Sequence, residues 1–253
     1  MILHAEMFGE GERIVFLHSG LQTGLTDFEY QRDYFQKGFQ VIVPDLRGHG
    51  KSKNNDFSNY FNDCAADLAE TLDYHQLDSI HLIGCSLGAL VALHFAKKFP
   101  EKIASLTLSG IFAEKPSNWS EMNHAQAKQQ KEFLRNEQAV EYYDQLHESD
   151  WKQFIYMGED EKWYPFDETS DLSHLSSPTL ILVGEGNELE TAGTLIYPKM
   201  NDKVHVSIIP FASHLVHLEQ PELYTQVLEV FIKRVICEKK EKETDSGNII
   251  SKQ

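Results

Sequence analysis

The five residues Gly84-Cys85-Ser86-Leu87-Gly88 could hold a reactive serine at a sharp turn. They follow the apolar run His81–Ile83, typical of a buried strand, and lead into the apolar segment Leu87–Phe99, which has the character of a helix. So tight a turn needs small residues on both sides of the serine, and the two glycines of the motif supply them. The pattern predicts that Ser86 is a nucleophile exposed at the carboxyl end of a strand.

A nucleophilic serine needs a general base within reach. In the strand-turn-helix arrangement of this motif, the histidine comes last in chain order. His214 follows the last predicted strand, Val204–Ile209, and His217 lies three residues further on. We expect His214 to be the base and His217 to be a packing or capping residue. Neither histidine has the spacing of a metal site with a third ligand, so we predict no bound metal and no cofactor.

The elements that must position these residues alternate along the chain. Strands are predicted for short, mostly apolar runs, namely Ile2–Met7, Arg13–His18, Gln40–Pro44, Ser79–Ile83, Ile103–Ser109, Thr179–Val183 and Val204–Ile209. Helical patterns lie between most of them, including Asn59–His75. Such alternation predicts an α/β fold with a mostly parallel, doubly wound sheet. The glycines at positions 9 and 11 separate the first two runs and predict an N-terminal antiparallel hairpin.

The alternation is interrupted once, and the chain also has a distinct end. Residues 112–176 contain no buried-strand run, and we interpret them as a helical insertion. The last helix is predicted from Pro221 to about Ile236. We therefore expect a single domain at 1–236, followed by a polar, disordered tail at 237–253.

Composition excludes several classes of partner. The chain has 253 residues and a formal net charge of −16, which disfavours binding to nucleic acid or to an anionic membrane surface. Three widely spaced cysteines favour reduced thiols and a cytoplasmic location. The first residues lack the pattern of a signal peptide, and no apolar stretch is long enough to span a bilayer. The expected partner is a small-molecule substrate, and the oligomeric state is left open.

Four motifs, in this order, carry a resemblance to a known family: His18-Ser19-Gly20, Asp45–Ser52, the serine motif, and His214 with His217–Pro221. Over residues 1–236 the chain is similar to the α/β-hydrolase superfamily. The resemblance is to its branch of small esterases, lactonases, cofactor-free haloperoxidases and C–C bond hydrolases. It implies that the insertion at 112–176 is a lid over the active site.

The resemblance also implies an oxyanion hole, formed by two backbone N–H groups that face the developing negative charge of the substrate. Leu87 would supply one N–H and the segment Gly20–Leu21 the other. His18 ends the strand beside this segment, and its ring has no required role.

The acid of the triad departs from the family pattern. The family places an aspartate three residues after the glycine that ends a strand, where this chain has Asn187. An amide can orient the histidine but cannot stabilise its charged form. Three alternatives remain open. Glu188 supplies the carboxylate, Asn187 acts as a neutral partner, or an acid such as Glu185 or Glu114 comes from elsewhere.

The activity that these residues predict is hydrolysis of a small, neutral carboxylic ester or thioester through an acyl-enzyme on Ser86. The insertion is aromatic and has no cluster of arginines, which argues against a dianionic substrate. Lactone cleavage, C–C bond cleavage and perhydrolysis could use the same serine and histidine. A ligand-binding or nearly inactive member of the fold is the alternative from another class, and it depends on Asn187.

Overall fold

The computed structural model describes residues 1–250, with side chains described through residue 241. One seven-stranded sheet runs through the molecule in the order β1-β3-β2-β4-β5-β6-β7. The strands are β1 (Ala5–Phe8), β2 (Arg13–Leu17), β3 (Gln40–Pro44), β4 (Ile80–Cys85), β5 (Ile103–Ser109), β6 (Thr179–Gly184) and β7 (Val204–Ile209). All neighbours from β3 to β7 pair in parallel. The predicted α/β fold is confirmed, and the carboxyl ends of six strands meet at one edge of the sheet.

The predicted N-terminal hairpin is wrong in its pairing. β1 is antiparallel as expected, but its partner is β3, with Ala5 opposite Pro44 and Phe8 opposite Val41. β2 lies inside the sheet between two parallel neighbours, β3 and β4. Four of its five residues are buried, whereas all four residues of β1 are half-buried and suit an edge strand. The glycines at 9 and 11 allow the chain to pass from the edge to the interior, since both have positive φ.

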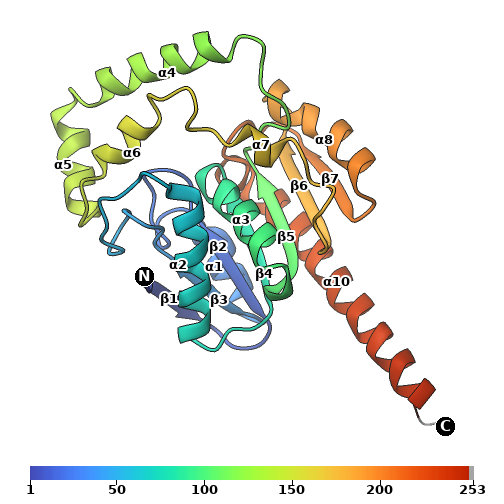
Figure 1. Cartoon of the computed structure of the whole chain (residues 1–253). Coiled ribbons are helices and arrows are strands. Elements are labelled where there is room, and N and C mark those ends of the chain that lie inside the picture. The colour runs from blue at the N-terminus through green and yellow to red at the C-terminus, as the bar shows by residue number, and fades with distance from the viewer. Residues whose placement is uncertain (251–253) are drawn as a thin grey trace.

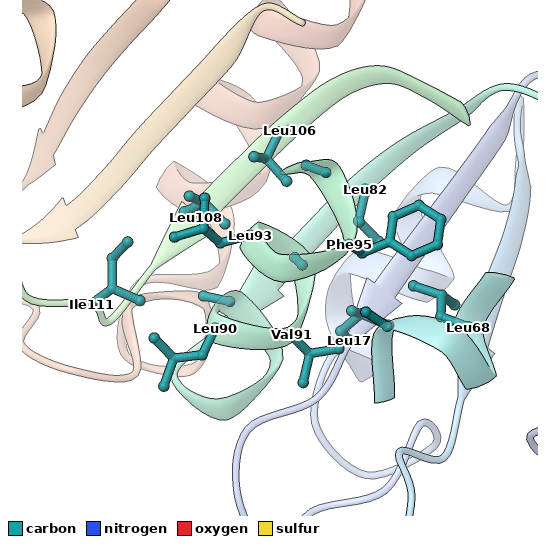
Figure 2. Close-up of a cluster of buried hydrophobic side chains, with 14 of the residues drawn as sticks. Leu17, Leu68, Leu82, Leu90, Val91, Leu93, Phe95, Leu106, Leu108 and Ile111 are labelled. Carbon is teal, nitrogen blue, oxygen red and sulfur yellow. The ribbon is translucent and has the colours of Figure 1, made fainter. Parts of the chain in front are cut away.

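Helices cover both faces of the sheet (Figure 1). The longer ones are α1 (Glu29–Phe35), α2 (Tyr60–Tyr74), α3 (Leu87–Lys98), α8 (Glu188–Met200) and α10 (Pro221–Ile250), with the short η1 (Pro100–Lys102) and α9 (Val216–Glu219) beside them. Alternate residues of β2 belong to different apolar clusters. Val15 and Leu17 pack in the cluster that contains α2 and α3, while Ile14 and Phe16 pack in the one that contains α1 and α10. Figure 2 shows part of the first cluster, in which Val91 and Phe95 of α3 lie near Leu17 of β2 and Leu68 of α2.

The insertion at 112–176 is helical, as predicted. It contains α4 (Trp119–Phe133), α5 (Glu137–Leu146), α6 (Lys152–Met157) and α7 (Phe166–Thr169). The first three form an arch at one end of the molecule (Figure 1). Trp119, Tyr164 and Phe166 pack against one another at the point where the insertion meets the sheet.

The predicted tail differs from the structure. α10 does not stop near Ile236 but continues to Ile250, projecting away from the sheet (Figure 1). Residues 251–253 of the predicted tail lie outside the described residues. Ion pairs spaced four residues apart, Lys233 with Glu229 and Arg234 with Glu238, support the helix as it leaves the core. The polar composition of residues 237–250, which predicted disorder, is therefore also compatible with a helix.

The turn between β4 and α3 contains Ser86 and is sharp. Ser86 has φ 54° and ψ −116°, between the last residue of β4 and the first of α3. A Cβ atom on Gly88 would overlap the carbonyl of Leu17 in β2, and one on Gly84 would overlap the carbonyl of Gly88. Helix α3 therefore approaches the sheet closely only because these two residues have no side chain.

We predict that Gly88→Ala lowers the free energy of unfolding by about 2 kcal/mol or more, because rigid backbone must move to admit the methyl group. Gly38→Ala is the matched control, since a Cβ there meets nothing within 4 Å. Urea unfolding of both variants measures the difference. Equal stability of the two variants would contradict the close approach of α3 to β2.

Candidate active site

Ser86 lies where the sequence places it, at the carboxyl end of β4. Its N–H donates to the carbonyl of Ser109 at 2.9 Å, which fixes the turn against β5. Ser86 and His214 line the same cavity of about 260 Å³. A Cβ atom on Gly110 would lie 3.1 Å from the Ser86 nitrogen and 3.0 Å from Cε1 of His214. The structure therefore brings the predicted nucleophile and base together, with a glycine filling the space beside both.

His214 is held by the loop between β7 and α9. The N–H groups of its two neighbours, Ser213 and Leu215, donate to the carboxylate of Glu219, each at 2.9 Å. The carbonyl of His214 lies 3.8 Å from the thiol of Cys85, next to the nucleophile. The His214 side chain is 43% exposed, so one edge of the ring stays open to the cavity.

The carboxylate on His214 comes from Glu190, which the sequence did not single out. Nδ1 of His214 donates to Oε1 of Glu190 at 2.6 Å, and the glutamate side chain is completely buried. A donor at Nδ1 leaves Nε2 as the ring nitrogen that can accept a proton. Oε2 of Glu190 has no hydrogen-bond partner among the described residues. His214 therefore has a carboxylate that can orient its ring and stabilise the positive charge of its protonated form.

Asn187 contacts Glu190 and not His214, so it does not have the role of neutral partner that the sequence left open. It is the N-cap of α8, and its Oδ1 accepts the N–H of Glu190 at 3.3 Å. Its Nδ2 donates to Oε1 of Glu190 at 2.5 Å, the same oxygen that binds His214. The amide therefore positions the carboxylate rather than the imidazole.

The three carboxylates considered from the sequence lie elsewhere. Glu188 is an exposed residue in the first turn of α8, and Glu114 is exposed as well. Glu185 is also exposed, and its Oε1 accepts the N–H of Phe211 at 2.9 Å. The expectation that Glu188 partners the histidine is corrected, because residue N3 of a helix, and not N1, reaches back toward the N-cap. The signal was present in the sequence: Asn187 and Glu190 have the spacing of a capping box.

Burial and charge act in opposite directions on the two partners. Burial raises the pKa of Glu190, and the hydrogen bond and charge of His214 offset only part of that rise. Burial lowers the pKa of His214, but the hydrogen bond and charge of Glu190 outweigh it, so the pKa lies above its ordinary value. Glu190 therefore stabilises the protonated imidazole. A histidine takes this form once it has accepted a proton as a general base.

Two of the three backbone residues predicted for the oxyanion hole line the cavity. Leu87 is the first residue of α3, so its N–H has no partner inside the helix, and Gly20 lies across the cavity. Leu21 does not line the cavity; it has φ 62°, and its carbonyl accepts from Nε2 of His147 at 3.2 Å. His147 follows α5, so a residue of the insertion holds the loop that contains Gly20.

Two buried histidines, His18 and His217, also hold the loop that contains Gly20. The N–H of Leu46 donates to Nε2 of His18 at 2.9 Å, so Nδ1 carries the proton and donates to the carbonyl of Ser19 at 2.8 Å. Asp27 accepts the N–H of Ser19 at 2.6 Å and bonds Nε2 of His217 at 2.9 Å, with both side chains fully buried. His217 is thus a packing residue that connects the loop of His214 to the loop of Gly20.

The insertion closes the other side of the cavity. Gln126 and Gln130 reach it from α4, Phe154 and Met157 from α6, and Trp163 from the loop that follows. No lysine, arginine, aspartate or glutamate is among the residues that line this cavity. Among the described residues, no group of histidine, cysteine, aspartate and glutamate side chains could hold a metal ion, and no helix is long and apolar enough to cross a membrane.

Comparisons with known proteins identify the family of this chain. The family described as the alpha/beta hydrolase fold matches residues 12–138, half of the chain. The chain belongs to the α/β-hydrolase fold family. It is 27% identical to the mouse serine hydrolase BPHL over 248 residues, covering 91% of this chain and 83% of that protein. It is 25% identical to 3-oxoadipate enol-lactonase 2 of Acinetobacter baylyi, covering 92% and 93%.

A solved structure agrees with these relatives. NosK from Streptomyces actuosus superposes with a TM-score of 0.76 at 26% identity, covering 89% of this chain and 99% of that one. The α/β-hydrolase identified here is therefore an enzyme of the hydrolase class, as its sequence predicted. Substrate and mechanism are not decided by family membership, because this fold supports many chemistries.

We predict that Glu190→Gln lowers the pKa of His214, because burial then acts without the opposing carboxylate. Glu188→Gln, two residues away on the same helix, leaves that pKa unchanged. NMR titration of the His214 imidazole in both variants measures the effect. A His214 pKa that moves with Glu188 and not with Glu190 would contradict the pairing.

Proposed function

We propose that this hydrolase cleaves neutral carboxylic esters or thioesters through an acyl-enzyme on Ser86. The observation that supports it most is the hydrogen bond from His214 to the buried Glu190, made by a histidine that shares a cavity with Ser86. A serine at a strained turn, an oriented imidazole and two backbone donors make up the set of groups that acyl transfer requires.

The proposed reaction has two halves. Nε2 of His214 takes the proton of the Ser86 hydroxyl as Oγ attacks the carbonyl carbon of the substrate. The N–H groups of Leu87 and Gly20 stabilise the oxyanion, and collapse of the intermediate expels the alcohol or thiol with the proton from His214. Water, deprotonated by His214, then attacks the carbonyl carbon of the acyl-enzyme. The bond to Oγ of Ser86 breaks, His214 returns the proton to Oγ, and the acid is released. None of these steps calls for a cofactor.

Glu190 performs the role usually given to an aspartate. Each imidazolium that forms during the reaction lies 2.6 Å from an oxygen of Glu190, whose side chain is completely buried, while the ring itself stays partly exposed to the cavity. A buried carboxylate interacts more strongly than an exposed one, because the local dielectric is low. The ligand-binding alternative depended on Asn187 standing at the acid position, and the hydrogen bond between His214 and Glu190 argues against it.

The cavity favours an uncharged substrate. Apart from His214, its polar lining consists of hydroxyl and amide side chains, with apolar walls from Leu215 and the insertion. A carboxylate in the substrate would lose its hydration there without gaining a cationic partner. A neutral lactone satisfies the same requirement, and the match to an enol-lactonase over 93% of its length makes lactone cleavage the second candidate.

A fluorophosphonate probe tests the proposal, because it labels a serine only when a working base activates it. We expect rapid labelling and hydrolysis of p-nitrophenyl acetate by the wild type, and loss of both in Ser86→Ala. Ser170→Ala, at an exposed position of the insertion, is the control and should behave as the wild type. A folded wild-type protein that neither reacts with the probe nor turns over esters or lactones would overturn the proposal.

A further inference from the structure

A second and larger cavity adjoins the active-site cavity. It has a volume of about 650 Å³ and lies between the start of α2 and the part of the insertion around α6. Met157 and Trp163 line both cavities. We call the larger space the outer cavity. These two side chains therefore lie at the boundary between the outer cavity and the space over Ser86.

Size suggests that the two spaces serve one ligand. The cavity over Ser86, at about 260 Å³, falls below the range of roughly 300–1,000 Å³ that is typical of small-molecule sites, whereas the outer cavity lies within it. The space over Ser86 accommodates the reacting ester group with a small substituent. A long substituent must extend beyond it. The unbranched side chain of Met157 is the easiest part of the boundary to displace.

The lining of the outer cavity indicates which substituent would fit. Its walls include aromatic rings from both sides, Phe57, Phe61, Tyr60 and Tyr156, together with the amides of Asn55, Asn59, Asn62 and Gln153. Phe57 stacks on Tyr60, and Phe61 stacks on His94, so the three rings from the α2 side are held in place. Among the described residues that line the outer cavity, Asp160 and Lys162 carry full charges, and these are opposite in sign, so the lining has no net charge from them. Such walls suit an uncharged aromatic or extended apolar group.

The geometry also separates the acyl side from the leaving-group side. The His214 ring lies beside Gly110, which follows β5, and it must protonate the leaving group, which therefore departs on the β5 side of Ser86. The outer cavity is built on α2, which lies over the opposite half of the sheet, near β3 and β1 (Figure 1). The group that extends past Met157 is then the acyl group and not the alcohol.

We propose that the outer cavity is the acyl subsite of this enzyme, selecting esters whose acyl part is long, uncharged and aromatic or apolar. This inference rests on the proposed function. The acyl chain passes between Met157 and Trp163 while the ester carbonyl stays at Ser86.

Three esters test this subsite: p-nitrophenyl acetate, p-nitrophenyl 4-phenylbutyrate and 4-phenylbutyl acetate. The last carries the same phenylbutyl group on the alcohol side. We expect the wild type to prefer the phenylbutyrate over p-nitrophenyl acetate in kcat/KM by on the order of tenfold or more, since buried apolar groups discriminate by about that factor. Asn62→Trp places an indole in the outer cavity and should abolish most of that preference, without a matching effect on 4-phenylbutyl acetate.

Tyr74→Trp, at an exposed position near the other end of α2, is the matched control and should keep the wild-type preference. If Asn62→Trp fails to fold, Ser58→Trp fills the same cavity from its exposed rim. An unchanged preference in a folded filling variant, or a loss confined to 4-phenylbutyl acetate, would overturn the acyl subsite. Hydrolysis of p-nitrophenyl acetate without any acyl preference would do so too, while leaving the proposed function intact. No hydrolysis of any of the three by an enzyme that also fails to react with fluorophosphonate would overturn both.

Discussion

The hydrogen bond between His214 and the buried carboxylate of Glu190 is the interaction on which the proposed chemistry depends. A carboxylate without solvent is unfavourable unless hydrogen bonds compensate it, and here one oxygen receives both His214 and Asn187. That arrangement raises the pKa of His214 and fixes which ring nitrogen carries a proton. The loops around Ser86 and Gly20 line the same cavity as this oriented histidine.

Parallel strand order explains how such distant residues meet. The segments of Gly20, Ser86, Glu190 and His214 follow β2, β4, β6 and β7, whose carboxyl ends share one edge of the sheet. Buried pairs then fix the loops relative to one another, as Asp27 does by binding both Ser19 and His217. The insertion contributes Met157 and Trp163 to the cavity that Ser86 and His214 line, so the proposed acyl selection and the proposed chemistry share one cavity.

Local patterns in the sequence predicted the parts of the site that depend on local geometry. The glycines around Ser86 must be small whatever the rest of the fold does, and the apolar runs specify strands directly. The acid could not be assigned by position after a strand, because α8 begins immediately at Glu188 and moves the reaching residue to Glu190. The capping-box spacing held that information. The partner of β1 and the outer cavity depend on tertiary packing between segments far apart in the chain, which no local pattern specifies.

The turnover number for ester hydrolysis in Glu190→Gln, compared with Glu188→Gln, tests the central claim most directly. Replacing the orienting carboxylate of a serine triad by an amide costs on the order of 10⁴-fold in kcat elsewhere, and we predict a loss approaching that size for Glu190→Gln. Glu188→Gln should keep wild-type turnover. Full activity of a folded Glu190→Gln enzyme, or a comparable loss in Glu188→Gln, would contradict the assignment of Glu190 as the acid of the triad.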